Sequence, residues 1–308
     1  AGVVLLLAAA QWALYGFTWQ DLPAYLLLAL SALPPVHTGR VPRRLGRVGL
    51  VGIAGVSVGV WILPAVPMLP SPDGRYAVGT EIYRWTDASR DEPHTADASD
   101  RRSVIAQAWY PTMRREDSGG GARLPYIDGT DHMPRQVSGL PGFLLHRYGQ
   151  IVTHADASAP LARSDRRWPV VIFSPGYGAP RAVYTGLATR LASRGFVVFV
   201  LDHPYESGVT RLPDGRVVGT HEMFPPGQPD RTRYMADQQL VRAADIRFVI
   251  DQISRPEVLS ARLRGGLIET SKVAVIGHSF GGAVSAMALS EDPRVVAAAN
   301  IDGTPYGD

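Results

Sequence analysis

The chain falls into two parts that differ in how hydrophobic and polar residues are arranged. Up to residue 70 the apolar residues form long runs, Ala1 to Phe17, Leu22 to Val36 and Val48 to Leu69. A run of about 20 apolar residues is long enough to cross the hydrocarbon core of a bilayer. We therefore expect membrane-spanning helices in residues 1–70 and a folded domain in residues 71–308. The alternative is a buried hairpin of apolar helices in a soluble protein.

The segment between the second and third runs is basic. All four arginines of residues 1–70 lie within residues 37–47, and Asp21 is the one acidic residue of that part. This part therefore carries a net charge of +3, which equals the formal charge of the whole chain. Short arginine-rich loops stay on the cytoplasmic side of a membrane. We expect a multi-pass protein of the cell membrane with residues 71–308 outside the cytoplasm, and no nucleic-acid partner, because the domain itself has no net charge.

Beyond residue 70, short apolar blocks alternate with segments of helical periodicity. The expected strands are Val104–Tyr110, Val170–Phe173, Val197–Leu201, Val273–Ile276 and Val295–Ile301, and the expected helices are Val183–Ser193, Arg233–Ser254 and Gly281–Leu289. Strands that are apolar throughout and separated by helices are typical of a mostly parallel sheet covered on both faces. The pattern predicts an α/β fold.

One strand of this series runs directly into a serine flanked by glycines. The sequence Gly277-His278-Ser279-Phe280-Gly281 stands between an expected strand and an expected helix. In this context a G-x-S-x-G sequence is typical of the nucleophile elbow of α/β-hydrolases. Its tight turn needs glycine on both sides and exposes the serine hydroxyl near a helix N-terminus, where developing negative charge is stabilised. A nucleotide-binding loop fits less well, because the Lys-Ser/Thr of a P-loop is absent.

An ester hydrolase also needs an oxyanion hole and an acid. The turn from Ser174 to Gly178 ends an earlier strand, and the N–H of Tyr177 is placed to act together with the N–H of Phe280. Asp302 follows the strand Val295–Ile301, where a carboxylate that orients a histidine is expected. An ordinary strand–helix turn and a turn-capping aspartate are the alternatives for these two features.

Several segments resemble the platelet-activating-factor acetylhydrolase family, an α/β-hydrolase family. They are Lys272–Ala283, the Ile-Asp-Gly at 301–303, Phe173–Arg181 and, more loosely, Gly79-Thr80 and Ala108–Pro111. Pro175 stands where the family usually has histidine, a feature shared with some polyester hydrolases and cutinase-like esterases. The resemblance covers roughly residues 75–308. It implies a phospholipid substrate with a short or oxidised sn-2 acyl chain, no calcium and no other cofactor, in a bacterial membrane-anchored member.

The general base is not evident. All eight histidines precede Ser279, whereas α/β-hydrolases place the histidine after the acid. We expect the catalytic histidine beyond residue 308, in a chain that is truncated at both ends, since residue 1 is not methionine. His203, at the end of a strand, is the one substitute base considered, and the alternative is that it shapes the wall of the crevice.

The remaining signals are weaker. The chain has no cysteine, which excludes disulfides and a cysteine nucleophile. The groups His94/Asp97/Asp100 and Asp128/Asp131/His132 lie in polar loop-like sequence, so we read them as solvated surface and expect no metal. The long connection from Ser207 to Arg231 is a candidate lid, with Met223 and Phe224 as candidate acyl contacts.

The sequence thus predicts a serine esterase of the acetylhydrolase type that acts through an acyl-enzyme on Ser279. Two alternatives stay open. One is a broader carboxylesterase or polyester hydrolase, and the other is a catalytically inactive hydrolase fold that serves as a membrane receptor or scaffold.

Overall fold

The computed structural model describes most of residues 68–306 and two short stretches before them. The described residues are 22–32, 49, 51–57, 68–113, 122–128, 148–149, 151–221, 227, 229–264 and 267–306. The chain divides into two compact units, Ala1–Pro67 and Met68–Asp308. The domain boundary predicted from the sequence was residue 70.

In the first unit the described residues are helical. Helix α2 spans Leu22–Ala32, within the second apolar run, and residues 51–57 form a helix within the third. No helix among the described residues has the length and apolar character needed to cross a bilayer. The run from Ala1 to Phe17 and the basic segment 37–47 lie outside the described residues.

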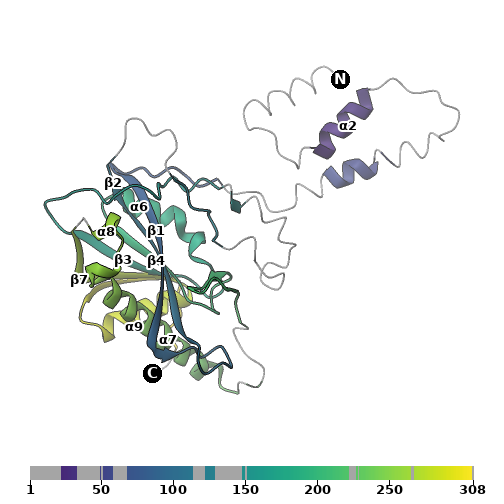
Figure 1. Ribbon diagram of the computed structural model, residues 1–308. Helices are drawn as coiled ribbons and strands as arrows, with labels where there is room; N and C mark the ends of the chain where they lie inside the picture. Colours follow the sequence, from purple (N-terminus) through teal and green to yellow (C-terminus); the bar gives the residue numbers. More distant parts are fainter. Residues whose placement is uncertain are drawn as a thin grey trace. The chain divides into compact units, whose positions relative to one another are not determined.

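The second unit is built on a six-stranded sheet (Figure 1). Its strands are β1 (Ala77–Asp91), β2 (Arg101–Thr112), β3 (Trp168–Ser174), β4 (Val197–Asp202), β7 (Ile268–His278) and β8 (Val295–Ile301). They are arranged in the order β1-β2-β4-β3-β7-β8. The β1–β2 and β2–β4 pairs are antiparallel, and the β4–β3, β3–β7 and β7–β8 pairs are parallel. The sheet is therefore mostly parallel, as the strand pattern predicted.

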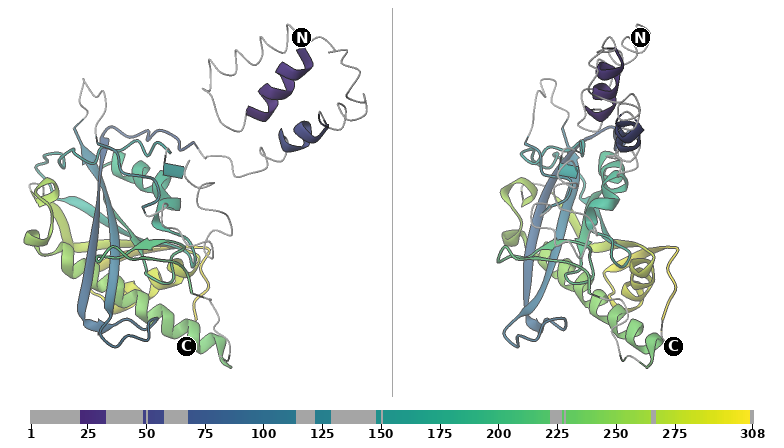
Figure 2. Two further views of the ribbon diagram at one scale, coloured as in Figure 1. Left: turned by 45° about the vertical axis from the view of Figure 1, so that its right-hand side comes forward. Right: turned by 90° about the vertical axis from the view of Figure 1, so that its right-hand side faces the viewer.

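Helices cover both faces of this sheet (Figure 2). The connections contain η4 (Arg181–Tyr184), α6 (Thr185–Ser193), α7 (Arg231–Ile253), η5 (Pro256–Val258), α8 (Ala261–Arg264) and α9 (Phe280–Glu291). Because successive residues of a strand point to opposite faces, each parallel strand supplies side chains to two layers. Helix α6 packs on one face of the sheet, against Val171, Phe173, Val198 and Val200. Helices α7 and α9 pack on the opposite face of the sheet.

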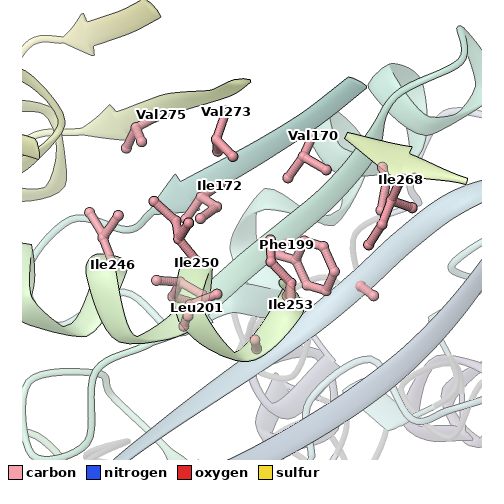
Figure 3. Close-up of a cluster of buried hydrophobic side chains, with 14 of the residues drawn as sticks. Val170, Ile172, Phe199, Leu201, Ile246, Ile250, Ile253, Ile268, Val273 and Val275 are labelled. Atoms are coloured by element: carbon pink, nitrogen blue, oxygen red, sulfur yellow. The ribbon is translucent and has the colours of Figure 1, made fainter. Parts of the chain in front are cut away.

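The larger core lies between α7 and the central strands (Figure 3). Ile246, Ile250 and Ile253 recur at helical spacing along α7, so they share one face of the helix. That face packs against alternate residues of the strands, among them Val170, Ile172, Phe199, Leu201, Val273 and Val275. Burial of each such side chain contributes about 1.5–3 kcal/mol to the stability of the folded state. This packing fixes α7 against the sheet, and therefore also fixes the positions of the polar residues on the rest of the helix.

The structure adds elements that the hydrophobic pattern did not predict. Strand β1, with mixed polar and apolar residues, extends the sheet beyond β2. The connection from Ser207 to Arg231 is partly a small hairpin of β5 (Thr210–Arg211) and β6 (Val217–Val218). Met223 and Phe224 lie outside the described residues, so the lid and its acyl contacts stay predictions.

Candidate active site

Ser279 stands at a sharp turn between β7 and α9. It precedes the first residue of α9 and has φ 52° and ψ −125°, a conformation that residues other than glycine rarely adopt. Its backbone N–H donates to the carbonyl of Ile301 at 2.8 Å, and its own carbonyl accepts from the Gly282 N–H at 2.8 Å. The hydroxyl makes no capping bond to the helix. The backbone is thus pinned while the hydroxyl is left available for chemistry.

The glycines on either side of Ser279 are required by close backbone contacts. A Cβ on Gly277 would overlap the carbonyl of Gly281, and a Cβ on Gly281 would overlap the carbonyl of Ser174. The second contact involves the last residue of β3, at the start of the predicted oxyanion turn. The elbow and that turn are therefore in van der Waals contact.

The turn that follows β3 is held by hydrogen bonds on both sides of Tyr177. The Gly176 N–H donates to the Tyr184 hydroxyl at 3.1 Å, and the Gly178 N–H donates to the carbonyl of Glu206 at 2.8 Å. Within the described part of the chain, the N–H of Tyr177 donates to no group. That free donor is what an oxyanion hole requires.

The second predicted donor stands beside the first. Phe280 is the first residue of α9, so its N–H has no partner within the helix. The rings of Tyr177 and Phe280 meet edge to face, with centroids 6.2 Å apart. The structure thus brings together the two residues whose N–H groups were predicted to form the hole.

Asp302 follows β8 next to the elbow. Its predecessor Ile301 accepts the hydrogen bond from Ser279, and Asp302 itself has φ 58° and is exposed. The turn is closed by Asn300, whose Oδ1 accepts from the Gly303 N–H at 2.7 Å and whose Nδ2 donates to the Gly303 carbonyl at 2.9 Å. The predicted acid and nucleophile therefore lie on adjacent strand ends, and their chemical roles stay predictions.

Two histidines near the elbow have partners other than Ser279. The ring Nδ1 of His278 lies 2.9 Å from the Tyr184 hydroxyl. His203 is fully buried, with Nε2 at 3.0 Å from the Ser174 hydroxyl and Nδ1 at 2.8 Å from Asp245. Burial, and then the charge of Arg242, lower the pKa of His203. We infer that His203 is a neutral structural residue that supports the end of β3.

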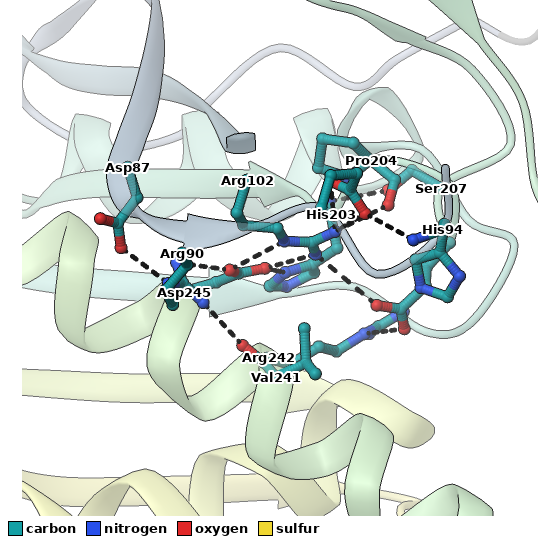
Figure 4. A network of polar contacts seen from close by, with 12 residues as sticks. Asp87, Arg90, His94, Arg102, His203, Pro204, Ser207, Val241, Arg242 and Asp245 are labelled. Atoms are coloured by element: carbon teal, nitrogen blue, oxygen red, sulfur yellow. Dashed lines mark hydrogen bonds and ion pairs between the residues drawn. The ribbon is translucent and has the colours of Figure 1, made fainter. Parts of the chain in front are cut away.

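Asp245 joins His203 to a buried ionic cluster (Figure 4). Arg102 makes two hydrogen bonds to Asp245, at 3.1 and 2.7 Å, and also binds Glu92. Arg90 forms a further ion pair with Asp245 at 2.9 Å. Burial alone would raise the pKa of Asp245, but Arg102 and the hydrogen bond from His203 outweigh it and hold the pKa well below its usual range. This cluster was not predicted from the sequence, because its members lie far apart along the chain.

Of the other polar groups singled out from the sequence, Asp128 and His94 differ from the solvated surface expected for them, and Asp131 and His132 lie outside the described residues. Asp128 is buried and pairs with Arg84 and Arg181. His94 packs against the rings of Tyr205 and His221, and burial lowers its pKa. Asp97 is an exposed cap that accepts from the Ser99 N–H at 2.8 Å. The described residues contain no group of side chains arranged to hold a metal ion.

A mostly parallel sheet with helices on both faces, and a serine held at positive φ between a strand and a helix, defines the α/β-hydrolase class. The sequence of the chain then specifies the family. A model of the family "Platelet-activating factor acetylhydrolase, isoform II" matches residues 66–213 and 258–306. The chain belongs to this family, and the resemblance inferred from its motifs is confirmed.

Individual esterases are also similar to the chain. The chain is 28% identical to a probable 1-alkyl-2-acetylglycerophosphocholine esterase of Arthroderma benhamiae, over 80% of this chain and 61% of that protein. It is 28% identical to cutinase 2 of Thermobifida cellulosilytica over 47% of the chain and 42% of the relative. A solved ferulic acid esterase of Streptomyces cinnamoneus is 30% identical with a TM-score of 0.63, over 79% of this chain and 64% of that one. The chain spans less than two thirds of the length of these three proteins.

Proposed function

We propose that the protein is a serine esterase that hydrolyses short or oxidised sn-2 acyl esters of phospholipids through an acyl-enzyme on Ser279. The observation that carries the proposal is the geometry at Ser279, a strained strand–helix turn in contact with a turn whose Tyr177 N–H has no partner among the described residues. Membership of the acetylhydrolase family supports the substrate class.

In the proposed reaction the Ser279 hydroxyl adds to the ester carbonyl while a general base takes its proton. The carbonyl oxygen becomes an oxyanion that accepts hydrogen bonds from the N–H groups of Tyr177 and Phe280. Collapse of the tetrahedral intermediate expels the alcohol and leaves the acyl group on Ser279, and water then releases the acid. Asp302 is proposed to orient the histidine that acts as base, since its exposed carboxylate follows the strand next to the nucleophile.

The substrate class is tested by comparing acyl chains on one head group. We expect the protein expressed from its complete reading frame to cleave sn-2 acetyl and butyryl phosphatidylcholines faster than the sn-2 palmitoyl lipid, with or without a chelator. Initial rates measured by fatty-acid release below the critical micelle concentration decide the comparison. Faster cleavage of the long chain, or loss of activity with EDTA, would contradict the acetylhydrolase assignment.

The runner-up is a broader carboxylesterase or polyester hydrolase. The match to a cutinase and the structural similarity to a ferulic acid esterase favour it. Three aromatic side chains also lie together at the elbow, where the Phe280 ring centre lies 6.2 Å from that of Tyr177 and 6.3 Å from that of Tyr306. Tyr177 and Tyr306 are partly exposed and offer aromatic surface for a flat aromatic acyl group. Hydrolysis of methyl ferulate or polyester film well above that of the acetyl phospholipid would select this alternative.

We further propose that residues 1–70 anchor the protein in the cell membrane, with residues 71–308 outside the cytoplasm. The apolar runs and the arginine-rich segment 37–47 support this arrangement. Alkaline phosphatase fused after Arg75 should be active in a bacterial host, and green fluorescent protein fused there and exported by the same route should be dark. Bright fluorescence with inactive phosphatase would reverse the orientation. A fusion found in the supernatant after ultracentrifugation would contradict the anchor.

A further inference from the structure

Arg242, in the middle of α7, is fully buried and reaches two segments of the candidate site at once. Its Nε donates to the carboxylate of Glu206 at 2.7 Å, and its Nη1 donates to the carbonyl of Pro175 at 2.6 Å. The guanidinium carbon also lies 4.8 Å from the centre of the Phe280 ring and 5.9 Å from that of Tyr177. An arginine that served only as the ion-pair partner of Glu206 would not need these contacts with the Phe280 and Tyr177 rings.

The contacts to Pro175 and Glu206 act on the turn that carries the Tyr177 N–H. Pro175 is fixed directly by Arg242. Glu206 binds Arg242 through its carboxylate, and its backbone carbonyl accepts from the Gly178 N–H. The turn is therefore held at Pro175 and Gly178, on both sides of Tyr177. Arg242 makes the first attachment directly and the second through its partner Glu206, whose backbone N–H also donates to the carbonyl of His203 at 3.1 Å.

The contact with Phe280 acts on the other donor. The guanidinium lies against the ring of the first residue of α9, whose N–H is the second predicted donor. A buried cation over an aromatic face is held more strongly than one in water. Since α7 is itself fixed on the sheet by its isoleucines, Arg242 sets the spacing between the turn and the helix end from a rigid support.

The side chain must be arginine for this geometry. The guanidinium is a flat fork whose Nε and Nη1 point in different directions, so it binds a carboxylate and a carbonyl at once and still presents a face to a ring. A lysine ammonium in the same space is a single point of charge. It can replace the charge but not the three simultaneous contacts.

We infer that Arg242 is a positioning residue for the oxyanion hole, which it sets by holding the Tyr177 turn against the N-terminus of α9. The inference rests on the proposed esterase function. Arg242 touches neither the substrate nor the reacting atoms. It acts by positioning the backbone N–H groups of Tyr177 and Phe280. Displacing the two donors by about 1 Å lowers the rate on the order of 10²-fold. It has little effect on binding of the ground-state ester.

The test is Arg242→Lys in the protein expressed from its complete reading frame, with a soluble acetyl ester as substrate. We expect kcat to fall about 10²-fold and KM to change less than threefold. A trifluoromethyl ketone, which adds the Ser279 hydroxyl to its carbonyl and places the resulting oxyanion in the hole, should lose affinity by the same factor as kcat/KM. The matched control is Arg247→Lys on the same helix, an exposed residue paired with Glu291, which should leave all three values unchanged.

Each outcome bears on one conclusion. If wild-type protein cleaves no ester and a fluorophosphonate does not label Ser279, the proposed function fails. If wild type is active but Arg242→Lys keeps kcat within threefold, or raises KM alone, the positioning role is refuted while the function stands. Should Arg242→Lys not fold, Phe280→Leu takes its place, because it removes the ring and leaves the buried ion pair intact. It should lower kcat without raising KM, and an unchanged kcat would refute the role.

Discussion

Replacing Ser279 by alanine should abolish ester hydrolysis, with kcat lowered by about 10⁴- to 10⁶-fold. Removing the nucleophile of a serine hydrolase leaves only the catalysis that binding and the oxyanion hole provide. Because the hydroxyl makes no capping bond to α9, its loss should leave the fold intact. The measurement is kcat on an acetyl ester, together with labelling by a fluorophosphonate and mass spectrometry of the labelled peptide.

The matched control is Ser290→Ala, at the other end of the same helix. The Ser290 hydroxyl is exposed and donates to the carbonyl of Met287, so its removal should change neither activity nor labelling. Full activity of Ser279→Ala, or a label on another residue, would show that Ser279 is not the nucleophile. Loss of labelling without loss of thermal stability is the result that supports the assignment.

The largest effect on stability is expected at Asp245. Asp245→Ala removes the shared partner of Arg102, Arg90 and His203, and Arg102 is fully buried. Breaking a buried ion pair from one side costs about 3–5 kcal/mol, a large part of the 5–15 kcal/mol that stabilises a typical domain. The free energy of unfolding, from urea titration at neutral pH, should fall by that amount.

The exposed control on the same helix is Asp251→Ala. Asp251 pairs with Arg294 and half of its side chain is exposed, so its loss should cost less than about 1 kcal/mol. Equal costs for the two variants would show that the buried cluster contributes nothing beyond a surface pair.

The same cluster predicts a dependence on pH. Since the native pKa of Asp245 is held below its usual range, its contribution is present at neutral pH. Wild type should lose that contribution as the pH falls below about 3.9, the ordinary pKa of aspartate. Asp245→Ala should lose less stability over the same acid range.

The parts of the site that are continuous in sequence could be predicted, and those assembled by the fold could not. The elbow needs glycine, serine and glycine at fixed spacing after a buried strand, so Ser279 and Phe280 were evident. Tyr177 was predicted from the glycine turn that ends one strand, and Asp302 from its place directly after another. Each depends on neighbours within a few residues.

Arg242, His203 and Asp245 illustrate the other case. Arg242 and Asp245 lie in a helix whose sequence mixes apolar and charged residues, and nothing local distinguishes them from Arg247 and Asp251, which are exposed. His203 was considered as a substitute base or as part of the crevice wall, and nothing in the sequence indicated its bond to Asp245. Their role depends on partners such as Arg102, 143 positions from Asp245, and a single sequence carries no signal of that pairing.

The positive φ of Ser279 has a consequence for attempts to engineer the protein. A residue with a Cβ held in this region costs on the order of 1–3 kcal/mol, and glycine would relieve that cost because it lacks a Cβ. A search for more heat-resistant variants at this turn would therefore select Ser279→Gly, which has no hydroxyl. Stability at position 279 favours glycine, whereas activity requires serine. Gains in thermal resistance therefore have to be sought away from the elbow.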